Sequence, residues 1–149
     1  MKTIALLLAI PIAWAAEQPV PFGHKTHAAA AIKCQDCHPN PDPGRAMTLP
    51  AASKCMTCHA TIATDKSAIQ KLAKWEGPIV WVRVATVPAF VFWSHRPHLK
   101  AGLKCEACHG AVAEMDVTTA AGPMKMAKCV DCHREKKATV ECAACHDLN

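Results

Sequence analysis

Five copies of one motif, Cys-x-x-Cys-His, contain all ten cysteines of this 149-residue chain. Two thiols at this spacing can bond the two vinyl groups of one porphyrin, and the histidine that follows can bind its iron as the proximal ligand. We therefore expect five covalently attached c-type haems. The motifs are Cys34/Cys37/His38, Cys55/Cys58/His59, Cys105/Cys108/His109, Cys129/Cys132/His133 and Cys142/Cys145/His146.

Other uses of cysteine explain the pattern less well. A structural zinc site pairs two Cys-x-x-Cys units, and five is an odd number. A dithiol redox motif normally occurs once, within a thioredoxin-like pattern that this sequence lacks. Disulfide bonds would not require a histidine after every second cysteine.

The remaining four histidines form two His-x-x-His pairs, each placed at the same distance before a motif. One constant shift in residue number superimposes the first pair and its motif on the second pair and its motif. A repeat without slippage indicates one structural unit used twice, and we expect units over about residues 20–76 and 90–149. The paired histidines, which we predict to be distal iron ligands, are His24 with His27 and His95 with His98.

Five low-spin haems require ten axial ligands, and the nine histidines leave one position unfilled. Methionine sulfur is another ligand used by c-type cytochromes. The candidates are Met47, Met115, Met124 and Met126, although a methionine more often fills gaps in a core. The alternative is an open, five-coordinate iron that could bind a substrate.

Large apolar side chains are scarce, with no tyrosine, three phenylalanines and four tryptophans. That is too little for a self-sufficient core in a chain of this length. We expect the haems to form the core, wrapped by a mostly irregular chain with short α-helices. The net charge of +5 is better explained by basic side chains that solvate haem propionates than by binding to nucleic acid.

Residues 1–16 are typical of a secretory signal peptide. Lys2 is the basic start, residues 4–12 are the apolar stretch, and residues 13–15 are an Ala-x-Ala-type cleavage site. The alternative, a membrane anchor, would need about 20 apolar residues. We therefore expect residues 17–149 to be a pentahaem domain exported to the periplasm, with an extracellular location as the alternative.

Three regions show a secondary-structure pattern. Residues 28–33 predict a short helix that leads to the first motif, and residues 55–75 predict a longer one. The residues that share one face of the longer helix are Ile62, Ile69, Leu72 and Trp75. β-Branched and aromatic residues at 79–84 and 89–93 predict two short strands that pair as a hairpin.

A His-x-x-His pair followed by Cys-x-x-Cys-His resembles the class III cytochromes, cytochrome c3 and its three-haem relative cytochrome c7. Residues 20–135 are also similar to the pentahaem cytochrome subunit of bacterial alternative complex III, a quinol-oxidising membrane complex. The segments that carry this similarity include Pro21–His27, Trp81–Val84, Val91–His95, Glu114–Val117, and Met126 ahead of Cys129–Arg134.

The class III resemblance implies which histidines share an iron, because the first histidine of a pair faces the first haem of its unit and the second faces the next haem. The implied pairs are His24 with His38, His27 with His59, His95 with His109, and His98 with His133. In cytochrome c7 the last haem takes its distal ligand from the loop before the middle motif, and here that loop contains methionine but no histidine. The complex III similarity includes Met126, so we predict Met126 as the distal ligand of the His146 haem, ahead of Met124 and Met47.

These features together predict an electron carrier, not an enzyme, that exchanges electrons with other redox proteins. One alternative is a subunit that docks to a membrane respiratory complex. A second is a small haem reductase or peroxidase with one open haem. A third is a cytochrome that polymerises outside the cell.

Overall fold

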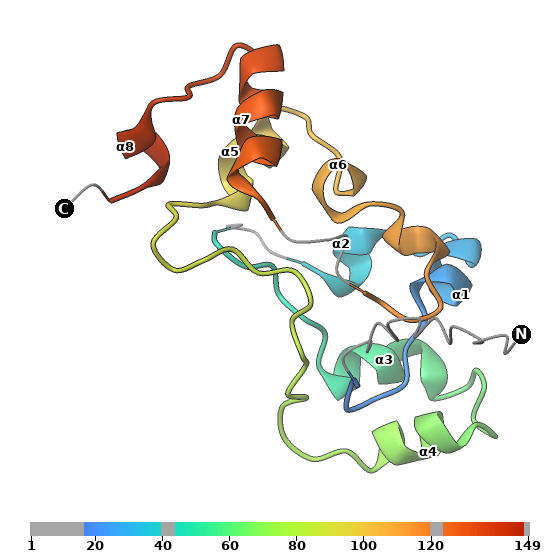
Figure 1. Ribbon diagram of the computed structural model, residues 1–149. Helices are drawn as coiled ribbons and strands as arrows, with labels where there is room; N and C mark the ends of the chain where they lie inside the picture. Colours follow the sequence, from blue (N-terminus) through green and yellow to red (C-terminus); the bar gives the residue numbers. More distant parts are fainter. Residues whose placement is uncertain (1–16, 40–43, 120–123, 148–149) are drawn as a thin grey trace, which may run out of the picture.

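Figure 1 shows short helices joined by long irregular segments, in a computed structural model that describes residues 17–39, 44–119 and 124–147. Residues 1–16, which contain the predicted signal peptide, lie outside the described residues. The elements are α1 (His24–Ala29), α2 (Cys34–Cys37), α3 (Ala52–His59), α4 (Ser67–Ala73), α5 (His95–Lys100), α6 (Glu106–His109), the 3-10 helix η1 (Val112–Glu114), α7 (Met126–Glu135) and α8 (Cys142–Cys145). Within the three ranges there is no β-strand, and the predicted fold class, a mostly irregular chain with short helices, is confirmed.

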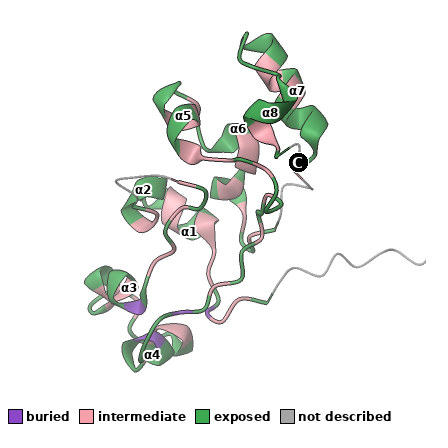
Figure 2. Cartoon of the chain, turned by 90° about the vertical axis from the view of Figure 1, so that its left-hand side faces the viewer, coloured by how far each residue is buried: buried purple, intermediate pink, exposed green. Residues whose placement is uncertain are grey.

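A small apolar cluster ties four segments together at one end of the molecule. Val20, Ala52, Leu72 and Ile79 are the buried residues of the described chain, drawn purple in Figure 2. They join the segment before α1 to α3, α4 and the segment after α4. The remaining helices bury no residue. Because an isolated helix shorter than about 12 residues is marginal in water, these helices require another apolar surface to pack against.

The predicted helix over residues 55–75 is wrong, because α3 and α4 take its place with a break between them. The break has a local cause: the Ile62 carbonyl accepts a hydrogen bond from Nδ1 of His59 at 2.9 Å, which replaces the bond it would accept in a continuous helix. Ala63 then adopts a positive φ of 56°, and α4 packs back against α3. Ile62 is 59 % exposed, whereas Leu72 belongs to the apolar cluster and Ile69 and Trp75 pack against it.

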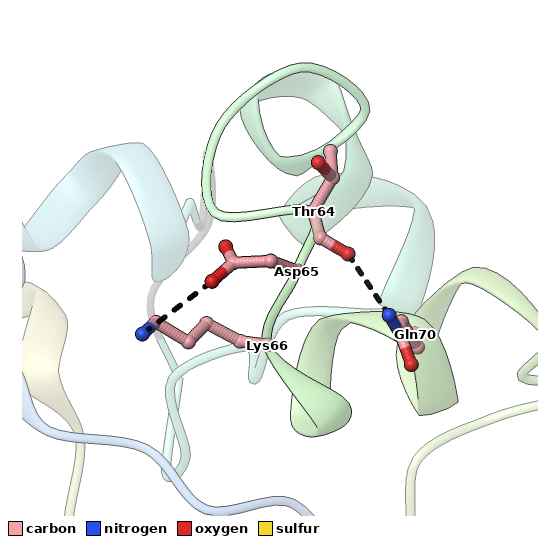
Figure 3. A network of polar contacts seen from close by, with 4 residues as sticks. All are labelled: Thr64, Asp65, Lys66 and Gln70. Atoms are coloured by element: carbon pink, nitrogen blue, oxygen red, sulfur yellow. Dashed lines mark hydrogen bonds and ion pairs between the residues drawn. The ribbon is translucent and has the colours of Figure 1, made fainter.

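Polar contacts lie in the turn that leads into α4 (Figure 3). Gln70 Nε2 donates a hydrogen bond to the Thr64 carbonyl at 3.4 Å. The Lys66 ammonium lies 3.6 Å from the Asp65 carboxylate, and both side chains are exposed. An exposed ion pair contributes little to stability, so the packing of α4 on the apolar cluster holds this turn.

The predicted hairpin is also wrong, because residues 79–84 and 89–93 do not pair with each other. Val91 instead forms an isolated antiparallel bridge with His146. The Arg45 guanidinium donates hydrogen bonds of 2.5–2.7 Å to three carbonyls of this segment, those of Val87, Pro88 and Val91. These carbonyls are therefore satisfied without a partner strand.

The predicted helix over residues 28–33 begins earlier, at His24, so that α1 contains both histidines of the first pair. It ends before Ala31, which adopts a positive φ of 59°, and the Ile32 N–H donates to the His27 carbonyl at 3.2 Å. The equivalent helix α5 ends in the same way, with Gly102 at φ +78° and the Leu103 N–H donating to the His98 carbonyl at 3.1 Å. A left-handed residue after a helix is a common way to end it, and here it turns the chain from each histidine pair toward the motif that follows.

Candidate haem sites

The five motifs form candidate sites I to V, numbered in chain order. Site I lies on α2, site II on α3, site III on α6, site IV on α7 and site V on α8 (Figure 1). Residues three and four apart share one face of a helix. Each motif therefore presents two thiols and an imidazole toward one side, where a flat ligand could contact all three.

The structure brings each of the four other histidines against one motif histidine. The ring centroids are 6.3 Å apart for His24 and His38, 6.1 Å for His27 and His59, 6.3 Å for His95 and His109, and 6.0 Å for His98 and His133. The angles between the ring planes, by contrast, range from 9° to 74°. Two ligands on one axis behave in this way, since their separation is constrained while each ring can rotate about the axis.

The ring separation fits an iron atom between the two imidazoles. A metal–imidazole bond is about 2 Å long and a ring centroid lies about 1 Å behind its nitrogen, so two axial rings stand about 6 Å apart. Rings in direct contact lie closer together, as Phe22 and His27 do at 4.5 Å. Sites I to IV therefore fit a haem held by two histidines.

Hydrogen bonds orient six of these rings with Nε2 free for the iron. A carbonyl oxygen can only accept, so a ring nitrogen that contacts one must carry the hydrogen. In each case that nitrogen is Nδ1, which leaves the Nε2 lone pair available and makes the imidazole a stronger donor to a metal. The Nδ1–carbonyl pairs are His27–Gly23, His38–Thr48, His59–Ile62, His95–Gly44, His98–Ser94 and His133–Thr139, at 2.6–3.0 Å.

The first histidine of each pair is oriented by the other repeat unit. Nδ1 of His24 lies 2.7 Å from the Thr118 hydroxyl, and Nδ1 of His95 lies 3.0 Å from the Gly44 carbonyl. Two backbone hydrogen bonds also join the units at these places. The Met115 carbonyl accepts from the N–H of Lys25 at 3.1 Å, and the Gly44 carbonyl accepts from the N–H of His95 at 2.8 Å. Each unit thus supplies the loop that positions a ligand of the other.

Sequence reasoning missed these loop residues and the aromatic residue that precedes each histidine pair. The Phe22 ring lies 4.9 Å from His24 and 4.5 Å from His27. Trp93 occupies the same position before the second pair, 5.2 Å from His95 and 4.4 Å from His98. The constant shift that relates the two units also superimposes Phe22 on Trp93, and this signal could have identified both.

Burial shifts the pKa values of two histidines and four cysteines at the candidate sites. It lowers the pKa of His24, which His38 and His27 lower further, and it lowers the pKa of His109. Both rings are then neutral near pH 7, the form that binds iron. Burial raises the pKa of four thiols, Cys37, Cys55, Cys105 and Cys129, so all four are protonated near pH 7.

Site V differs from the other four. Among the described residues His146 is paired with no second histidine, and the ring that lies beside it is that of Phe90, at 6.0 Å and tilted by 32°. Met126 is the first residue of α7 and is 67 % exposed. The alternatives Met47 and Met124 are half-buried. The assignment of Met126 as the tenth ligand remains a prediction.

Two family models match the chain, one on each repeat unit. Residues 9–76 match the class III cytochrome C family, and residues 91–147 match cytochrome c7 and related cytochrome c. A comparison with curated proteins gives no match. The fold, the paired rings and the two matches define a multihaem c-type cytochrome, an electron-transfer protein that binds c-type haem. Each match covers less than half of the chain, and together the two matches support a c3/c7-like multihaem cytochrome.

Two further expectations concern the relation of the protein to membranes. Neither match concerns the pentahaem subunit of alternative complex III, so that similarity remains a prediction. No helix in the described part of the chain is both long and apolar enough to cross a membrane.

Proposed function

We propose that this protein is a periplasmic pentahaem cytochrome that carries electrons between other redox proteins and is not itself an enzyme. The observation that carries the proposal is the set of four histidine ring pairs at 6.0–6.3 Å, each joining a motif histidine to a histidine outside the motifs. The five motifs and the absence of any left-over cysteine support five haems.

The proposed attachment residues are the ten motif cysteines: Cys34, Cys37, Cys55, Cys58, Cys105, Cys108, Cys129, Cys132, Cys142 and Cys145. The proposed proximal ligands are His38, His59, His109, His133 and His146. The proposed distal ligands are His24, His27, His95 and His98, with Met126 for site V. The proposed units are residues 20–76, with two haems, and 90–149, with three.

The role of the chain is to hold each iron in one coordination geometry. Bound haem supplies a one-electron iron couple. Six of the eight imidazoles at sites I to IV would be kept in place in either oxidation state, since their Nδ1–H groups are bonded to backbone carbonyls. Little rearrangement of the ligands then accompanies electron transfer, and hydrogen bonds at Nδ1 favour the ferric state by strengthening the donor nitrogen.

A second candidate function is favoured by site V. His146 has an apolar ring, Phe90, beside it in place of a second histidine. If Met126 does not bind this iron, the haem is five-coordinate and could bind a small substrate, as in a haem reductase or peroxidase. The spin state of this one haem separates the two functions.

Intact-mass analysis and absorption spectra of the matured protein test the proposal. Five covalent haems and an all-low-spin oxidised spectrum are expected for the electron carrier. Four or fewer haems after full maturation would contradict the ligand scheme. A high-spin component that binds cyanide rapidly would favour the reductase or peroxidase. Co-purification with membrane subunits would assign the protein to a respiratory complex.

A further inference from the structure

The candidate sites are not arranged in the order in which they occur in the sequence. In Figure 1 and in the rotated view of Figure 2, the motif helices follow one another along the molecule as α3, α2, α6 and α7, with α8 beside α7. Site II therefore lies at one end of the molecule and site I lies between it and site III. Four junctions between neighbouring sites support this arrangement.

Sites I and II are joined through α1. His24 faces His38 of site I, and His27, one helical turn later, faces His59 of site II. Two irons bound by ligands one helical turn apart must be close to each other.

Sites III and IV are joined in the same way through α5, whose His95 faces His109 and whose His98 faces His133. A second contact strengthens this junction. The Lys128 ammonium, at the start of α7, donates a hydrogen bond to the Cys108 carbonyl of site III at 3.0 Å. Sites III and IV thus repeat the arrangement of sites I and II.

The two units meet at sites I and III. The loop at Gly44 holds His95 of site III, and Thr118 holds His24 of site I. The N–H of His95 also donates to the Gly44 carbonyl at 2.8 Å. Equivalent sites of the two units therefore face each other, with sites II and IV pointing away from the junction.

Site V continues the row of sites beyond site IV. The helix α8 follows α7 in the chain and lies beside it in Figures 1 and 2. The Phe92 N–H donates to the Cys145 carbonyl at 2.8 Å, and the chain reaches α5 three residues after Phe92. Both observations place site V at the end of the molecule that contains α5 and α7, away from α3 (Figure 1).

We propose that the five sites form a single file in the order II, I, III, IV, V, so that an electron crossing the whole molecule enters and leaves at sites II and V. The proposal rests on the proposed pentahaem function. It means that electrons pass between the repeat units only through sites I and III. It also means that redox partners need to reach the two terminal sites, formed by α3 and α8, and not the middle of the chain.

The test is NMR spectroscopy of the fully reduced holoprotein, in which low-spin ferrous haems are diamagnetic. Each haem is first assigned through contacts with its own motif residues. Nuclear Overhauser contacts between haem substituents are then expected for I with II, I with III, III with IV, and IV with V. A contact between haems II and III, or the lack of one between I and III, would overturn the proposed order.

Two matched variants give a second readout. His27→Met changes the distal ligand of terminal site II and is expected to shift the resonances of one neighbouring haem, that of site I. His98→Met makes the equivalent change at interior site IV and is expected to shift two, those of sites III and V. If both variants perturb the same number of neighbours, the single file is wrong. Mass spectrometry of each sample counts the haems, so failure of the pentahaem proposal is distinguished from a different order.

Discussion

The Thr118 hydroxyl lies 2.7 Å from Nδ1 of His24, although 94 positions separate the two residues in the chain. The reverse relationship holds between Gly44 and His95, across 51 positions. Because each loop belongs to one repeat unit and each histidine to the other, neither unit can orient its first proposed distal ligand alone. The two units that match different cytochrome family models are therefore one structural whole at sites I and III.

Replacing Thr118 by valine removes the hydroxyl that orients His24 while keeping the shape of the side chain. We expect a loss of about 1 kcal/mol in the free energy of unfolding, the usual net contribution of one hydrogen bond. A haem at site I should also gain a higher midpoint potential, because an imidazole without a partner at Nδ1 is a weaker donor to ferric iron. Thermal unfolding and a redox titration resolved by haem measure the two effects.

Thr119→Val is the matched control, since Thr119 is the adjacent residue and is exposed. It should leave both the stability and the potential of site I unchanged. Equal shifts in the two variants would mean that loss of a threonine hydroxyl in this loop, and not the bond to His24, causes the effect.

Replacing Arg45 by lysine should loosen the segment that precedes α5 and pairs with His146. Lysine keeps the charge but cannot donate in a fork to three carbonyls at once. We expect a loss of about 2 kcal/mol in the free energy of unfolding, because hydrogen bonds from a charged donor exceed neutral ones in strength. The absorption and potential of site V should change more than those of site II, measured in the same redox titration. A variant as stable as the parent would show that the carbonyl contacts do not hold this segment.

Folding should depend on haem attachment. Four buried side chains form the apolar cluster of the described residues, and six of the eight α-helices found there bury no residue. Expression without the haem-attachment machinery should therefore yield a chain with little helical circular dichroism that proteases digest rapidly. A compact apoprotein that resists digestion would show that the chain has a sufficient core of its own.

Replacing Met126 by alanine tests the tenth ligand. If Met126 binds the site V iron, the oxidised protein has a weak sulfur-to-iron absorption band at the red end of the spectrum, and the variant loses it. A methionine ligand also raises the potential relative to histidine, so the highest potential of the five should fall in the variant. Met47→Ala and Met124→Ala are the controls and should keep the band. Loss of the band in one of these instead would reassign the ligand, and its absence from the parent would indicate an open iron.

Secondary structure was harder to predict than chemistry in this chain. The helix predicted over residues 55–75 has a plausible apolar face, but the Ile62 carbonyl accepts from His59 and the helix breaks there. The strand residues before α5 have the right composition for a hairpin, but Arg45 and His146 satisfy their backbone groups. In both cases a ligand or a distant side chain competes with the local hydrogen-bonding pattern, and a single-sequence pattern does not report that competition.

The chemistry could be predicted from the sequence, because the attachment motif is local: two cysteines and a histidine within five residues are enough to predict a c-type haem site. The sequence also shows that histidines recur in pairs at a constant offset. His24 therefore corresponds to His95, and His27 to His98. Which sites and loops are neighbours, by contrast, depends on the tertiary structure. The order of the sites along the molecule and the exchange of Thr118 and Gly44 between the units depend on contacts across 94 and 51 positions, which are set when the two units dock and are not encoded in any one segment.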